Sequence, residues 1–237
     1  MVTDVSKDAL MVSSLLAFKT EMGTVVSQAF MADEMFVTAL KESFKVFINK
    51  RQNKPPELIA KYIDKLLKSG KGMTEEEVEN KLDQCLELFR FVQGKDVFEA
   101  FYGKDLAKRL LLQKSASVDA EKSMLSKLKK ECGAGFTNKL EGMFKDMELS
   151  RDIMTSYRQS TKSEASFDMN VFVITFGFWP SYPLTEMILP VEFSRAQEAF
   201  TEYYVQKHSG RHLTWQNSLG HCAVKCNFPL VFPIDVG

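Results

Sequence analysis

The chain has few histidines and lacks the common nucleotide-binding motifs, so it offers little support for an enzyme. Its 237 residues include three histidines, all near the C-terminus. Neither the GxxxxGK[ST] phosphate-binding loop nor a GxGxxG motif after a strand occurs. Glutamates at positions 75–77 sit at an expected helix start, where the helix dipole explains them better than acid–base catalysis. We therefore expect no catalytic residue and no cofactor.

Cysteine is also scarce, and no CxxC pair is present. Such usage indicates reduced thiols in an intracellular protein. His208 and His212, followed by Cys222 and Cys226, suggest a zinc site, but their order and spacing match no common zinc finger. A Cys–His nucleophile would require Cys85 or Cys132 to leave an apolar helix face. We favour core and surface roles over metal binding or nucleophilic catalysis.

Neither charge nor hydropathy is extreme. Lys and Arg together number 31, as do Asp and Glu, which argues against a dedicated nucleic-acid-binding protein. Purely apolar runs such as residues 171–174 are far shorter than the ~20 residues of a membrane-spanning helix. The N-terminal sequence MVTDVSKDALMVSS lacks the pattern of a signal peptide. We therefore expect no membrane segment.

What the chain does have is phenylalanine, 19 residues in all, in stripes of helical spacing up to about residue 160. Pro55 and Pro56 suit the first turn of a helix. Thr74 and Glu77 match a capping box, and Ser117 can cap a later helix. A last pair of helices is expected over residues 136–147 and 150–160. The residues predicted to be buried are Phe89, Phe98, Phe101, Leu110, Leu125, Leu128 and Phe144.

The pattern changes after the polar residues 161–166. The sequence MNVFVITF at 169–176 is rich in β-branched and aromatic residues and predicts a buried strand. Residues 191–207 have a helical pattern. Residues 212–216 and 221–227 predict two strands joined by a hairpin at 217–220. The fold class predicted is mainly α with a small α+β part at the C-terminus.

The strongest local charge feature is a set of basic residues between positions 104 and 130. Its ordinary interpretation is a solvated face, and the alternative is an electrostatic docking surface for an acidic partner. A helical nucleic-acid-binding module is a third possibility, against which neutral net charge and the lack of stacking aromatics weigh. The set comprises Lys104, Lys108, Arg109, Lys114, Lys122, Lys127, Lys129 and Lys130.

Several long motifs closely resemble the cullin family, and two resemble its cullin-4 branch in particular, namely SASVDAEKSMLSKLK and KLEGMFKDMELS. The resemblance runs almost unbroken from about residue 31 to 228. The other motifs are KPPELIAKYID (54–64), GKDVFEAFYGKDLAKRLL (94–111), FGFWPSY (176–182) and KHSGRHLTWQNSLG (207–220).

Cullins are non-catalytic scaffolds of RING-type ubiquitin ligases, so the resemblance implies a scaffold in ubiquitin-dependent protein degradation. It implies that residues 1–53 end the third helical cullin repeat, that 54–160 form a four-helix bundle, and that 161–237 start the α/β domain. It also implies a cytoplasmic and nuclear location. In the family, strands of the α/β domain pair with a RING-box protein, which recruits the ubiquitin-conjugating enzyme.

The resemblance places RING-box binding on segments that contain Val171, Val173, Thr214, Trp215, Val224 and Cys226. Residues 229–237 (PLVFPIDVG) do not match the charged turn that the family has there. Pro229 and Pro233 cannot donate ladder hydrogen bonds, so we expect an open sheet edge. The repeats that bind substrate adaptors and the lysine that is modified by a ubiquitin-like protein have no counterpart in this sequence, so neither function is assigned to it.

Overall fold

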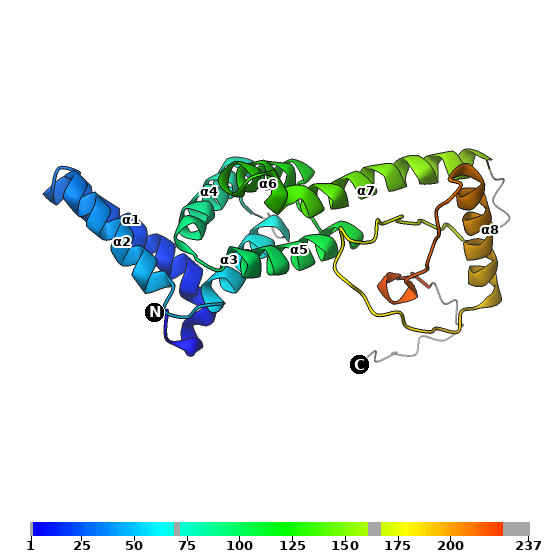
Figure 1. Cartoon of the computed structure of the whole chain (residues 1–237), viewed down its shortest axis with the longest axis horizontal. Coiled ribbons are helices and arrows are strands. Elements are labelled where there is room, and N and C mark those ends of the chain that lie inside the picture. Colours follow the sequence, from blue (N-terminus) through cyan, green and yellow to red (C-terminus); the bar gives the residue numbers. More distant parts are fainter. Residues whose placement is uncertain (1, 69–71, 161–166, 225–237) are drawn as a thin grey trace. The chain divides into compact units, whose positions relative to one another are not determined.

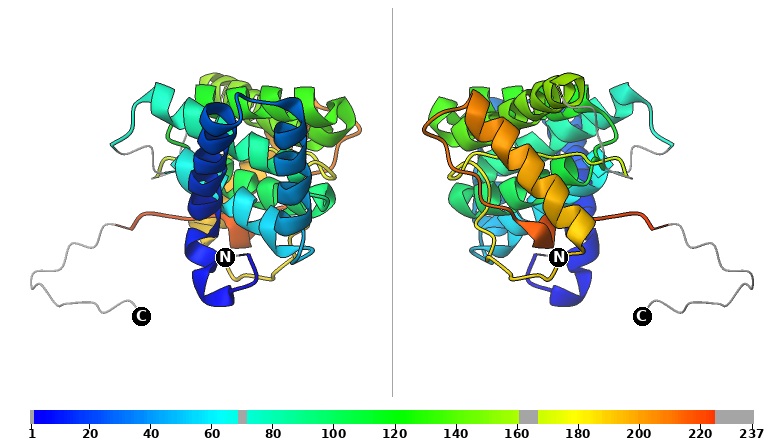
Figure 2. Two further views of the ribbon diagram at one scale, coloured as in Figure 1. Left: turned by 90° about the vertical axis from the view of Figure 1, so that its left-hand side faces the viewer. Right: turned by 90° about the vertical axis from the view of Figure 1, so that its right-hand side faces the viewer.

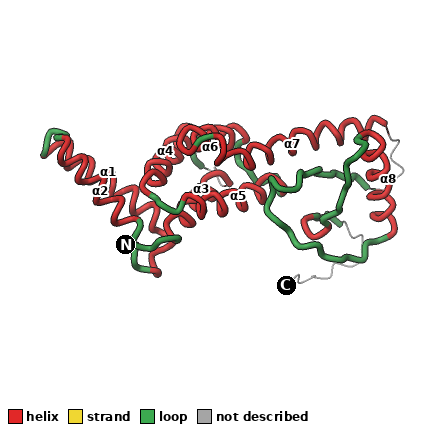
Figure 3. The backbone as a smooth tube through the Cα atoms, viewed as in Figure 1, coloured by secondary structure: helices red, strands yellow, loops and turns green. Residues whose placement is uncertain are grey.

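The computed structural model describes residues 2–68, 72–160 and 167–224, and they form two compact units (Figure 1). Unit 1 comprises Met1–Ser156 and Asn170–Pro180, and unit 2 comprises Tyr157–Met169 and Ser181–Gly237. The chain therefore leaves unit 1, returns to it for one short segment, and leaves it again. In the parts of the chain that are described, the regular elements are all helices (Figure 3).

Unit 1 begins with the short helix η1 (Val5–Leu10) and the helices α1 (Met11–Ala29) and α2 (Glu34–Ile48). The last two lie side by side (Figures 1 and 2), and α2 begins where the Asp33 side chain accepts from the Met35 amide. By length and composition alone, the stretch Val5–Ala29 could cross a membrane. This stretch was not predicted from the sequence, because only uninterrupted apolar runs were considered there. Part of this stretch packs inside unit 1, since Val12 and Leu15 are buried and α1 contacts α2, α3 and α4.

In the described part of unit 1, five further helices follow, and several of their starts agree with local signals in the sequence. Pro55 and Pro56 lie in the first turn of α3, both bonds of the capping box between Thr74 and Glu77 form at α4, and Ser117 accepts from the Ala120 amide at α6. The helices are α3 (Lys54–Lys68), α4 (Glu75–Phe91), α5 (Lys95–Leu111), α6 (Val118–Cys132) and α7 (Ala134–Ser160).

One helix boundary was predicted wrongly. Residues 136–147 and 150–160 are not a pair of helices but belong to the single helix α7 of 27 residues, which continues into unit 2. Nothing between them breaks a helix, because Glu148 and Leu149 are good helix formers. Gly133, with a φ of 86°, does end α6 as expected, whereas Gly135 lies inside α7.

The core of unit 1 confirms Phe89, Phe98, Leu125 and Leu128 as buried. The Phe89 and Phe98 rings lie 4.6 Å apart. The prediction was wrong for three other residues, which are only half-buried, because they lie at the edges of their helices' apolar faces. On α5 the core-facing residues are Phe98, Tyr102 and Leu106. The half-buried residues are Phe101, Leu110 and Phe144.

Unit 2 contains the helix α8 (Val191–Lys207), which has the predicted bounds. Its Phe200 ring contacts Tyr157 at 5.2 Å and Trp215 at 5.9 Å between ring centroids. The predicted hairpin is wrong, since residues 217–219 form the short helix η2 (Asn217–Leu219) and 212–216 form no strand. Residues 221–224 form no strand either, and 225–227 lie outside the described part.

Candidate partner-binding surfaces

The segment Asn170–Pro180 returns to unit 1 and contains most of the strand predicted at 169–176. It forms no strand, because its backbone bonds to a helix. Asp146 of α7 is 5% exposed and accepts three hydrogen bonds from this segment. The Thr175 amide donates at 2.7 Å, the Thr175 hydroxyl at 2.8 Å and the Trp179 indole N–H at 2.8 Å. A β-strand forms backbone hydrogen bonds with a neighbouring strand, but here the backbone of the segment bonds to side chains of α7 instead.

Ser150, one turn further along α7, holds the same segment at Val173. Its hydroxyl accepts from the Val173 amide at 2.8 Å and donates to the Val173 carbonyl at 3.1 Å. One turn in the other direction, Gly142 lets the Phe178 ring approach so closely that a Cβ would lie 2.5 Å from Cδ2. Residues four apart share a helix face, so Gly142, Asp146 and Ser150 form one surface, which we call the α7 clamp.

The clamp divides the extended segment into two edges. In an extended chain the backbone groups of alternate residues point to opposite sides, so Val173 and Thr175 face α7 whereas Phe172 and Ile174 face away. Within the described residues, the backbone groups of Phe172 and Ile174 make no hydrogen bond. One edge of the segment is therefore satisfied and the other is open.

The sequence-predicted binding residues fall in both units. Val171 is buried and Val173 half-buried in unit 1. In unit 2, Thr214 is exposed, and the Trp215 indole N–H donates to the Thr201 hydroxyl at 3.1 Å. Val224 is 76% exposed, and Cys226 lies outside the described residues.

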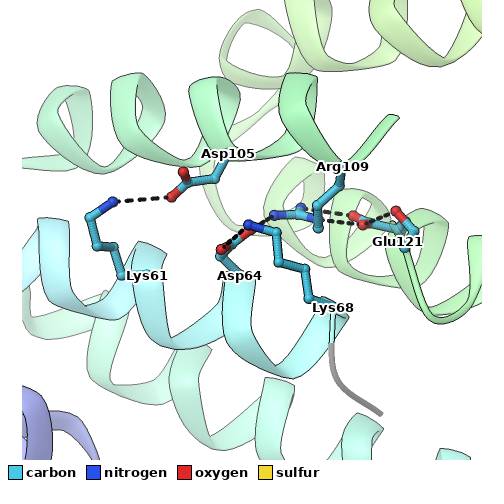
Figure 4. Close-up of polar contacts among 7 residues, drawn as sticks. Lys61, Asp64, Lys68, Asp105, Arg109 and Glu121 are labelled. Carbon is cyan, nitrogen blue, oxygen red and sulfur yellow. Dashed lines mark hydrogen bonds and ion pairs between the residues drawn. The ribbon is translucent and has the colours of Figure 1, made fainter. Parts of the chain in front are cut away.

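Arg109 does not belong to a basic surface, because its side chain is fully buried. Figure 4 shows its guanidinium between two carboxylates. Nε and Nη2 donate to Glu121 at 2.6 and 3.0 Å, and Nη1 donates to Asp64 at 2.6 Å. Lys68 bonds the other Asp64 oxygen at 2.7 Å, and the Ser115 hydroxyl donates to Glu121 at 2.8 Å. The network ties α3, α5 and α6 together.

The environment of Arg109 keeps it charged. Burial alone would lower the pKa of the guanidinium, but the hydrogen bonds and charges of Glu121 and Asp64 raise that pKa above its ordinary value. The neighbouring Tyr102 ring lies 5.6 Å from the guanidinium carbon, and burial with the Glu121 charge raises the pKa of its hydroxyl. Arg109 therefore belongs to a buried ion-pair network that connects helices of the bundle, and it is not part of a docking surface.

The remaining basic residues divide into paired and unpaired lysines. Lys127 contacts Glu79 at 2.6 Å and Asp83 at 2.5 Å, and Lys129 contacts Glu141 at 2.9 Å. These two lysines belong to links between helices. Among the described residues, four exposed lysines of the basic set form no ion pair, namely Lys104, Lys108, Lys114 and Lys130.

The cysteines and histidines form no evident chemical centre in the described ranges. Within residues 2–68, 72–160 and 167–224, no cluster of three or more His, Cys, Asp or Glu side chains is placed to hold a metal ion. Cys85 is buried, which raises the pKa of its thiol to about 12. Burial also raises the pKa of the Cys132 thiol. Such thiols are poor nucleophiles at neutral pH.

Comparison with known families accounts for both parts of the chain. Residues 2–154 match the family model of the cullin alpha solenoid domain, and residues 173–235 match that of the cullin alpha+beta domain. The chain belongs to the cullin family. Because the second match starts at residue 173, the first residues of this cullin's alpha+beta domain are those that the α7 clamp holds.

Individual cullins agree with this assignment. Cullin-4A of Mus musculus is 56% identical over 232 residues, which cover 96% of this cullin chain and 31% of the relative. Cullin-4 of Dictyostelium discoideum is 54% identical over 231 residues, covering 96% and 29%. Cullin-3 of the same organism is 46% identical over 220 residues, covering 91% and 28%. The chain thus spans about a third of the length of these relatives.

Proposed function

We propose that this cullin chain is a non-catalytic scaffold segment of a cullin-RING ubiquitin ligase, and that it binds a RING-box protein in support of ubiquitin-dependent protein degradation. Within that scaffold, residues 1–53 would end a helical repeat, 54–160 would form the four-helix bundle and 161–237 would start the α/β domain. The ubiquitin-conjugating enzyme would be bound indirectly, through the RING-box protein. The location we propose is cytoplasmic and nuclear.

The open edge of the extended segment is the observation that best supports RING-box binding. Phe172 and Ile174 present backbone donors and acceptors that no described residue satisfies. An exposed edge of this kind accepts an added strand through main-chain hydrogen bonds. Thr214 and Trp215 of unit 2 would supply side-chain contacts.

A proline substitution tests this edge directly. Ile174→Pro removes the amide donor of the open edge and leaves the clamp bonds of Val173 and Thr175 available. Copurification and calorimetry with a co-expressed RING-box protein should show binding weakened roughly 5- to 30-fold, the effect of losing about 1–2 kcal/mol. Ile174→Ala, which keeps the donor, is the matched control and should bind nearly as the parent does. Equal binding by the proline variant would contradict strand addition at this edge.

The unpaired lysines support a second contact, with an acidic partner such as an acidic tail of the conjugating enzyme. We expect Lys104→Glu with Lys108→Glu to weaken such binding at low salt, because exposed charges act over about a Debye length. The matched control is Lys41→Glu with Lys50→Glu, at exposed positions of α2 and the turn that follows it. It makes the same change in net charge outside the basic set and should leave the binding unchanged. Unchanged binding at low salt would contradict this contact, and salt-sensitive binding of arbitrary duplex DNA would favour the nucleic-acid alternative.

A further inference from the structure

The α7 clamp pairs with an extended chain as a neighbouring strand would, although it lies on a helix. Four residues of an α-helix rise about 6 Å, and two residues of a strand span about 6.6 Å. Asp146 and Ser150 are four apart, and the residues that they bond, Thr175 and Val173, are two apart. The two spacings match, so consecutive turns of α7 meet alternate residues of the segment, which runs in the opposite direction.

We propose that Asp146 and Ser150 are positioning residues for partner binding: α7 acts as a surrogate strand that fixes which edge of residues 171–175 is open. The partner-binding half of this inference rests on the function proposed above. The clamp itself is a feature of unit 1 alone. Without it, the segment could rotate about its own axis and present either edge, so an added strand would have to order it first.

The chemistry of the clamp favours one arrangement. Among the described residues, no cation forms a hydrogen bond with the buried Asp146 carboxylate, which accepts from three neutral donors of Thr175 and Trp179. A buried charge without hydrogen-bond donors is unfavourable. If the segment were released, the Asp146 carboxylate would therefore lose its donors or become exposed to solvent. The Ser150 hydroxyl satisfies both backbone groups of Val173, which leaves that residue nothing to offer a partner strand.

Trp179 provides a direct readout, because the chain has only two tryptophans. In a Trp215→Phe background, Trp179 is the sole indole, and it is buried beside Asp146. Asp146→Ala should shift its emission to longer wavelength and increase acrylamide quenching several-fold. Asp152→Ala, on an exposed position of the same helix, is the matched control and should change neither. Asp146→Asn keeps an oxygen acceptor and should fall between them.

The same substitutions at Asp146 and Asp152, made in the parent chain so that Trp215 is intact, should rank in RING-box affinity by how well each variant keeps the clamp. We expect Asp146→Ala to bind at least roughly tenfold more weakly than Asp152→Ala, and Asp146→Asn to recover part of the loss. Ser150→Ala separates positioning from folding, since it removes only the Val173 bonds. It should speed exchange of the Val173 amide while the helical circular dichroism of the folded chain remains that of the parent.

The outcomes are distinguishable. A parent chain that does not bind any RING-box protein overturns the proposed function, while the fluorescence still decides whether the clamp exists. Trp179 emission unchanged by Asp146→Ala overturns the clamp. A clamp that opens in Asp146→Ala and in Ser150→Ala without loss of RING-box affinity overturns the positioning role and leaves the proposed function standing.

Discussion

The two units of this cullin chain differ in how completely they bury their own side chains. Unit 1 has a continuous apolar interior that includes Leu82, Phe89 and Phe98. In the described part of unit 2, only Ala196, Phe200 and Tyr204 are buried. A helix that buries three side chains cannot by itself offset the entropy of ordering a domain. Unit 1 is therefore expected to be the more stable of the two units.

The polar interiors differ in the same way. Unit 1 buries the charged side chains of Arg109, Glu121 and Asp146, and each has its hydrogen bonds. In unit 2 the polar contacts described lie nearer the surface, as in the bond from Trp215 to Thr201. Large apolar side chains such as Ile188 and Val224 are exposed there. Exposed apolar side chains are not confined to unit 2, since Phe176 of unit 1 is exposed as well. The contrast between the units therefore lies in their interiors and not in their surfaces.

The largest expected effect comes from breaking the buried network of unit 1. Arg109→Met leaves the buried Glu121 without its cation and leaves Asp64 with Lys68 alone. Loss of one partner of a buried ion pair costs about 3–5 kcal/mol. Urea unfolding followed by circular dichroism measures the change in the free energy of unfolding. Lys104→Met, on an exposed position of the same helix, should change it by less than about 0.5 kcal/mol. Similar midpoints for the two variants would show that the network does not hold the bundle together.

Two phenylalanines with equal burial in different units sharpen the comparison. Phe98→Ala in unit 1 should cost about 3–5 kcal/mol and lower the main helical transition. Phe200→Ala in unit 2 should leave that transition in place and change the fluorescence of Trp215, whose ring it contacts. Phe101→Ala is the control for Phe98, because its half-buried ring should cost roughly half as much or less. A Phe200→Ala variant whose main transition falls as far as that of Phe98→Ala would contradict the independence of the units.

The smallest effect tests the close approach at the clamp. Gly142→Ala places a Cβ against the Phe178 ring and should destabilise the chain by about 1–3 kcal/mol, as overpacking does. Gly135→Ala, on the same helix with nothing within 4 Å, should stabilise it by up to about 1 kcal/mol. Thermal unfolding of the pair should therefore shift in opposite directions. A neutral or stabilising Gly142→Ala would mean that the Phe178 ring moves aside freely.

The helices could be predicted because they depend on local sequence signals, whereas the segment held by α7 could not, because it depends on contacts with residues far away in the sequence. The capping box at Thr74, the start at Pro55 and the bounds of α8 all depend on residues within a few positions of one another. The segment with Val173 was predicted as a strand because its composition suits one, but its bonds go to Ser150, 23 residues away. No periodicity in the segment itself reveals that a helix takes the place of a strand.

Arg109 was misplaced although the sequence held a usable signal. It lies seven residues after Tyr102, on the stripe that also carries Phe98, so its spacing indicated the interior. Its charge alone suggested the surface. Burial becomes possible only because Asp64 and Glu121, from two other helices, meet it. Their meeting is a property of the packed bundle that sequence spacing does not show.

Amide hydrogen exchange at residues 172–175, with and without a RING-box protein, tests the central claim most directly. The account predicts that, in the chain alone, the amides of Val173 and Thr175 are protected by Ser150 and Asp146 while those of Phe172 and Ile174 exchange rapidly. On addition of the RING-box protein, Phe172 and Ile174 should become protected by an added strand. Protection of all four amides in the chain alone, or rapid exchange at Phe172 and Ile174 in the complex, would contradict it.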